Sequence, residues 1–403
     1  MAETRKASRF IVPVAVAGVA AATIGLVPAL AASGDPDLPE ITAQQLIEKI
    51  AASDTQTLSG TFKISTDLGL PALDGLASGL GGLGGGDGGP SSADPTEKLT
   101  ALFSGSHTLR IAADGPERQR LTLLDGSDEY SLIHNGDDVW GYDSKSNEAF
   151  HEKGAAGGPG APEKDEKFPG TPKQLADEVL KAAGDTTSIT VDGTAKVAGR
   201  NAYQLVIKPK QSGSTVESVK IAVDAANGTP LKFTLSSVEG GKPVVDAGFT
   251  KVDFGKPAAS EFTFKAPKGA KVTEGAAEKA GKGEQAPGDL PEGFEEGIPG
   301  LGKDFGKDFG KGFGGSGEGM NVIGEGWTTI AKLDTGAPAP KTDDAPKEVQ
   351  GFLDSFGDKV TGKFGSGTVY KTKLVNALLT DDGKVYVGAV TKDALVNAAN
   401  AGK

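Results

Sequence analysis

Residues 200–269 read RNAYQLVIKPKQSGSTVESVKIAVDAANGTPLKFTLSSVEGGKPVVDAGFTKVDFGKPAASEFTFKAPKG. Apolar residues occupy every second position between clusters of Gly, Pro, Asn and Ser, which is the pattern of antiparallel strands. Polar residues such as Gln204, Lys208 and Lys220 take the alternate positions, so the predicted sheet has one apolar and one solvated face. The apolar face needs covering elements or a ligand. Its predicted members are Tyr203, Leu205, Ile207, Val219, Ile221, Val223, Leu231, Phe233 and Leu235.

The alternation changes phase between Phe249 and Val252. A phase change of this kind predicts a β-bulge near Thr250 and Lys251, and bulges bend the strand that carries them. The sequence therefore predicts an α+β fold with a strongly curved antiparallel sheet, covered by two or more helices.

Upstream segments supply further strands and the two covering helices. Residues 41–52 (ITAQQLIEKIAA) predict an amphipathic helix with Thr42 as N-cap and Gln45 at the third helical position, and residues 171–183 predict a second helix. Residues 58–64 alternate as a strand, and residues 95–150 predict a meander with tight turns, including an Asn-Gly hairpin at Asn135. The helices and strands together predict one α+β domain over residues 41–273.

Two Gly-rich segments interrupt this pattern, at residues 68–95 and 274–319. Both are predicted to be surface insertion or linker, because Gly at so many positions disfavours a stable helix. Each segment also has apolar residues at helical spacing, Leu in the first and Phe in the second. The alternative prediction is therefore a lid or an interfacial segment that becomes ordered on a lipid surface. Residues 320–403 regain globular character and predict a small α+β segment with strands near 327–332, 374–379 and 385–390 and a helix at 393–401.

The N-terminus has the order of a secretory signal. Basic residues precede an apolar run at 10–30 and an Ala-Leu-Ala site at 29–31, which predicts a signal peptide over residues 1–31. An uncleaved membrane anchor is the alternative, since the run is long enough to span a bilayer. We therefore expect export to the cell envelope or secretion, with anchoring if the signal is not cleaved.

Composition excludes several classes of function. The chain has no Cys, which excludes disulfides, a Cys nucleophile and Cys-ligated zinc. Its net charge is -12 and no basic stripe is evident, so nucleic acid is not an expected partner. His107, His134 and His151 are far apart, and no nucleophile elbow or phosphate-binding Gly loop occurs. We expect no catalytic residues, no metal and no cofactor; Asp pairs beside turns are solvated carboxylates, with calcium ligation as the alternative.

The organisation resembles the LolA-like superfamily of envelope lipoprotein carriers, which includes actinobacterial lipid-carrying lipoproteins and RseB-type stress regulators. The resemblance covers ITAQQLIEKI with LSGTFKIS, the hairpin IHNGDDVWGYDSKSNEAF, the helix TPKQLADEVL and the strands that follow it. It implies an open half-barrel whose helices close its mouth and hold acyl chains. The chain departs from the lipid-anchored relatives because it lacks a Cys for lipid attachment.

The combined expectation is a non-enzymatic protein that binds or transports lipid or the acyl chains of a lipoprotein in the cell envelope. The alternative is an RseB-like regulator that binds a membrane anti-sigma factor, and a structural surface protein is a third possibility. The predicted ligand-binding residues are Phe62, Ile64, Trp140, Tyr142, Leu205, Ile207, Phe233 and Leu235. Ordinary core packing is the competing interpretation for each, because a core and a cavity wall share one composition.

Overall fold

The computed structural model describes residues 36–69, 93, 105–153, 173, 177, 180, 181, 183–275, 320–334 and 357–402. The predicted signal peptide, most of the Gly/Leu-rich insertion and most of the linker lie outside the described residues. Among the described residues, no helix combines the length and hydropathy needed to cross a membrane.

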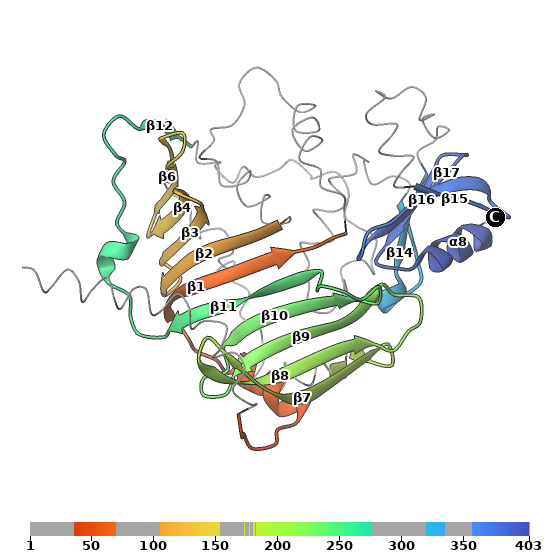
Figure 1. Ribbon diagram of the computed structural model, residues 1–403, viewed down its shortest axis with the longest axis horizontal. Coiled ribbons are helices and arrows are strands. Elements are labelled where there is room, and N and C mark those ends of the chain that lie inside the picture. The colour runs from red at the N-terminus through yellow and green to blue at the C-terminus, as the bar shows by residue number, and fades with distance from the viewer. Residues whose placement is uncertain are drawn as a thin grey trace, which may run out of the picture.

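The large sheet has twelve strands in the order β12-β6-β5-β4-β3-β2-β1-β11-β10-β9-β8-β7. All neighbours are antiparallel except β12, which runs parallel to β6. The sheet curves and stays open, with β12 and β7 as its two edges (Figure 1). The strands are β1 (Thr57–Thr66), β2 (Gly105–Asp114), β3 (Arg118–Asp125), β4 (Asp128–Asn135), β5 (Asp138–Asp143), β6 (Glu148–Lys153), β7 (Thr187–Val197), β8 (Arg200–Pro209), β9 (Val216–Asp224), β10 (Pro230–Ser237), β11 (Val245–Asp253) and β12 (Lys271–Glu274).

The predicted bulge lies in the ladder that joins β1 to β11. Thr61 pairs with Lys251 but Phe62 pairs with Phe249, so Thr250 is the extra residue. The Thr250 hydroxyl donates a hydrogen bond to the Thr61 carbonyl at 3.2 Å. The prediction from the change of phase is therefore confirmed.

Gly60 permits the close approach of these two strands. A Cβ atom at this position would lie 2.3 Å from the Lys251 carbonyl oxygen. A side chain of any size would push β11 away from β1 beside the bulge, which explains a Gly in the interior of a strand.

Alternation along the ladders defines two faces. We call the side that carries Phe62, Leu205 and Leu235 the helix-bearing face, because Leu46 and Ile47 of helix α2 (Ala43–Ala51) pack there. The predicted capping box is confirmed, since Thr42 and Gln45 exchange hydrogen bonds of 2.9 and 3.2 Å between side chain and backbone. The second predicted helix is helical at its described residues, and its Leu180 joins the α2 cluster.

We call the opposite side the strap face. After β11 the chain crosses this face as residues 255–270, here called the strap, which includes a short 3-10 helix, η4 (Ala259–Phe262). Phe262 of the strap is 1% exposed and therefore buried. The strap then leads into β12, which adds to the free edge of β6 (Figure 1).

The C-terminal module forms a separate sheet of six strands in the order β13-β14-β18-β17-β16-β15. Helix α8 (Lys392–Ala401) covers one of its faces, where Leu395 packs with Leu378 and Tyr386. The predicted C-terminal hairpin and helix are confirmed as β17, β18 and α8. The elements are β13 (Met320–Ile323), η5 (Gly326–Thr328), β14 (Ile330–Asp334), β15 (Gly357–Gly362), β16 (Gly365–Tyr370), β17 (Asn376–Thr380) and β18 (Lys384–Gly388).

The module docks on the helix-bearing face of the large sheet. Trp327 and Leu374 are buried against Ile207 and Leu235. The Trp327 indole donates a hydrogen bond of 2.8 Å to the Thr187 hydroxyl, which satisfies its one polar atom. The sequence is compatible with a segment that stands alone, docks on the large sheet or completes it. The structure shows docking, because the segment packs as a second sheet against the first.

Replacing Trp327 by Ala is expected to lower the free energy of unfolding by about 3–5 kcal/mol, because truncating a large buried side chain leaves a cavity. Urea denaturation followed by circular dichroism measures the change. Val238→Ala is the matched control, since Val238 is 53% exposed. Equal urea midpoints for the two variants would contradict a docked module.

The buried Asp224 predicts acid sensitivity. Burial raises the pKa of Asp224, but hydrogen bonds from Arg200 and from the Asn227 and Ala226 amides outweigh it and leave the pKa below its usual value. The carboxylate therefore stabilises the fold above its unfolded-state pKa of about 3.9, and this contribution is lost as pH falls through the lower folded-state pKa.

We expect Asp224→Asn to reduce the difference in urea midpoint between pH 7 and pH 3 relative to the unmodified protein. Asp137→Asn is the control, because Asp137 is exposed beside a turn. A pH dependence that is the same in both variants would show that Asp224 does not contribute it.

Candidate functional site

Three of the predicted ligand-binding residues are packed into the core. Leu205 is 4% exposed and contacts α2, while Ile207 and Leu235, at 7% and 2%, lie against the C-terminal module. These side chains already have the protein neighbours that the apolar face required. The β8–β9 end of the helix-bearing face is therefore occupied by the protein itself.

The other three residues on this face, Phe62, Ile64 and Phe233, are only half-buried. The ladders place Phe62 opposite Phe249, and Ile64 and Phe233 both opposite Ala247, so they lie side by side on β1, β11 and β10. The Phe62 and Phe249 rings meet edge to face at 5.0 Å. On β2 the row passes through Leu109, which is 2% exposed, and half-buried apolar residues follow on β3. We call this set the central apolar strip, and its members are Phe62, Ile64, Leu121, Leu123, Phe233, Ala247 and Phe249.

Packed regions border the strip on both sides. On one side, Tyr130, Leu132 and Val139 form a buried cluster on β4 and β5. On the other side lie the clusters built by α2 and by Trp327. Within the strip, large apolar side chains keep part of their surface exposed.

Trp140 and Tyr142 lie on the strap face, away from the other six predicted residues. Their ring centroids are 5.3 and 5.4 Å from that of Phe264 in the strap. Trp140 also stacks on His151 at 3.9 Å. These two aromatic residues hold the strap against β5, so the structure does not bring them together with the strip.

His134 is the one imidazole on the helix-bearing face that is buried. It is 3% exposed, and neither ring nitrogen has a hydrogen-bond partner among the described residues. A general base needs a neighbouring group that orients it, and the described part of the chain supplies none for this ring. Among the described residues, no three His, Asp or Glu side chains cluster in a way that could hold a metal ion.

Comparison with known proteins gives no match to any family model and no match among curated proteins. Matches among solved structures include Pseudomonas aeruginosa MucB with MucA, at 16% identity and a TM-score of 0.37 over 89% of this chain and 96% of that one. An uncharacterized conserved protein from Thermus thermophilus has 11% identity and a TM-score of 0.30, over 58% and 98% of the two chains.

A LolA superfamily protein from Nitrosomonas europaea has 12% identity and a TM-score of 0.19, over 56% of this chain and 99% of that one. TM-scores below 0.5 at such identities carry no argument about function. The strand order and register of the chain itself define its fold, and the central apolar strip is the basis for any functional assignment.

The aromatic contact between strap and sheet can be tested by proteolysis. Phe264→Ala should speed tryptic cleavage after Lys265 and Lys268, because the strap loses its packing on Trp140 and Tyr142. Thr263→Ala is the control, since the neighbouring Thr263 is exposed. Cleavage at the same rate in both variants would show that the ring contacts do not fix the strap.

Proposed function

We propose that this protein is a non-enzymatic binder of acyl chains, from lipid or from a lipoprotein, and that the chains lie along the central apolar strip. The observation that carries the proposal is a row of half-buried apolar side chains on β3, β1, β11 and β10, between two packed regions of the same face. A curved sheet that leaves such a row partly exposed offers an elongated apolar surface, which fits an acyl chain.

The energetics suit this ligand. Burial of apolar surface contributes about 25 cal/mol per Å², or about 0.8 kcal/mol for each methylene group. A long acyl chain therefore gains several kcal/mol without any charged contact. The strip supplies aromatic and aliphatic side chains and no charged group, so it would discriminate by length and shape more than by headgroup.

The proposed contacts are fewer than the sequence predicts. Phe62, Ile64 and Phe233 are the residues we assign to the acyl chain, with Phe249 beside them. Leu205, Ile207 and Leu235 would act indirectly, because they fix the covering elements that border the strip. Export to the cell envelope remains part of the proposal and comes from the sequence of residues 1–31.

The regulatory alternative, binding of a membrane anti-sigma factor, stays a prediction from sequence resemblance. It requires a protein partner that contacts the C-terminal module. A pulldown with the full chain and with Trp327→Ala, which loosens the module, distinguishes it from acyl binding alone: a regulator loses its partner, whereas an acyl carrier has none to lose.

Ile64→Glu is expected to weaken binding of a fluorescent C16 fatty acid at least about tenfold, because acyl contact would require burial of a carboxylate. The control is Lys63→Ala, which changes the adjacent, exposed residue on the strap face. Trp140→Phe should also leave binding unchanged, since Trp140 faces the strap.

Lipid extraction and mass spectrometry of the purified protein provide an independent measurement. Acyl species recovered from the unmodified chain and from Lys63→Ala, and depleted in Ile64→Glu, agree with the proposal. Equal affinities for the fatty acid in all variants, or extracts without lipid from both native-host and heterologous preparations, would refute it.

A further inference from the structure

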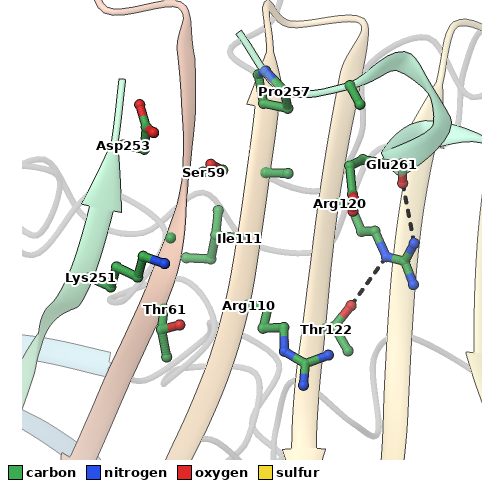
Figure 2. Close-up of a pocket in the computed structure, with 13 residues that line it drawn as sticks. Ser59, Thr61, Arg110, Ile111, Arg120, Thr122, Lys251, Asp253, Pro257 and Glu261 are labelled. Atoms are coloured by element: carbon green, nitrogen blue, oxygen red, sulfur yellow. Dashed lines mark hydrogen bonds between the residues drawn. The ribbon is translucent and has the colours of Figure 1, made fainter. Parts of the chain in front are cut away.

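The strap face carries a groove of about 430 Å³ that sequence analysis does not predict. Its floor consists of the central strands β11, β1, β2 and β3, and the beginning of the strap forms one wall through Pro257, Ala258 and Glu261 (Figure 2). The groove lies on the opposite side of the sheet from the central apolar strip. It is therefore a separate site.

Cationic side chains outnumber acidic ones in this groove. Arg110, Arg120 and Lys251 line it, against two acidic residues, Asp253 and Glu261. The excess of positive charge is notable in a chain whose net charge is -12. Local charge of sign opposite to that of the whole protein indicates attraction of an anionic group to this place.

The cations are poorly compensated within the protein. Among the described residues, Arg120 and Lys251 form no salt bridge. Arg110 has a single long contact of 3.9 Å to Glu129, and the two side chains are 64% and 39% exposed. An exposed pair at this distance contributes little. The positive charges thus remain available to a ligand.

Arg120 is held in place by neutral partners. Its guanidinium donates hydrogen bonds to the Thr122 hydroxyl at 3.3 Å, the Ser131 hydroxyl at 3.4 Å and the Glu261 carbonyl at 3.3 Å. Thr122 and Ser131 are 2% and 1% exposed, so these supports are rigid parts of the sheet. A guanidinium fixed in this way loses little side-chain entropy when it binds an anion, and its planar fork matches phosphate oxygens.

The ladder brings the other two cations to the same row. Lys251 and Arg110 are the direct partners of Thr61 on its two sides, so the three residues lie across neighbouring strands. Arg110 in turn pairs with Thr122, beside Arg120 (Figure 2). Two strand spacings of about 4.8 Å separate the backbones of Lys251 and Arg110, a gap that their long side chains can close on one oxyanion.

We propose that this groove binds a phosphate group, held by Arg120 with Arg110 and Lys251, while the Thr61 hydroxyl contributes a neutral hydrogen bond. The group can belong to a phospholipid headgroup or to a free phosphate compound, since both present the same oxygens. The groove has room for a headgroup, and its charged lining favours a polar group over an acyl chain. This site is independent of acyl binding on the other face.

The first experiment is isothermal titration calorimetry of the full chain with inorganic phosphate at constant ionic strength. Arg110→Gln and Lys251→Gln should each weaken binding about tenfold, because each removes a charge-assisted hydrogen bond. Both keep the contacts of Arg120, so the fold is retained. Lys220→Gln, an exposed Lys on the same face outside the groove, should bind as the unmodified protein does.

The second arm identifies the source of the phosphate group. Co-sedimentation with phosphatidylglycerol vesicles that is lost in Lys251→Gln and retained in Lys220→Gln assigns a lipid headgroup. Saturable binding of inorganic phosphate with the same variant dependence, but no vesicle binding, assigns a free phosphate compound. Absence of saturable binding in both arms, or equal losses in Lys251→Gln and Lys220→Gln, would overturn the proposal.

Discussion

The pairing of β1 with β11 is the constraint on which the rest of the structure depends. It joins the first strand of the domain to a strand almost two hundred residues later, between Ser59 and Asp253 at one end and Thr66 and Val245 at the other. The meander β2–β6 and the run β7–β10 become one sheet only through this ladder. Closing so long a loop costs entropy, but the cost grows slowly with length, and the ladder provides many backbone hydrogen bonds in return.

The same ladder organises both faces. Thr61 and Phe62 are adjacent, yet one lines the cationic groove and the other lies in the apolar strip. The bulge at Thr250 lets β11 keep its apolar residues on the correct side while its direction changes. Because the strap begins directly after β11, its path across the opposite face also follows from this bend. Packing on the two faces is therefore coupled through one strand pair.

Local structure was predictable from the sequence where it depends on local pattern. Alternation predicted the strands, the Thr42 and Gln45 pair predicted the helix cap, and the change of phase predicted the bulge. The face on which each hairpin places its side chains was not predictable, because a turn hides the register that relates one strand to the next. Trp140 and Tyr142 were grouped with Phe62 for this reason. The groove was missed likewise, since Lys251 meets Arg110 only through β1.

Amino-acid composition also does not distinguish a packed core from a binding surface. In this protein the exposed fraction of each side chain distinguishes them. Leu235 and Phe233 alternate on one strand and point to the same face, but the first is 2% exposed beneath the C-terminal module while the second is half-buried in the strip. The difference arises because the C-terminal module covers Leu235, and a long segment of sequence separates this module from the strand that carries Leu235. A shift of one residue in the β1–β11 register would exchange the apolar strip with the polar groove. The fold therefore depends on this register. Gly60 contributes to it, because a side chain at this position would displace β11.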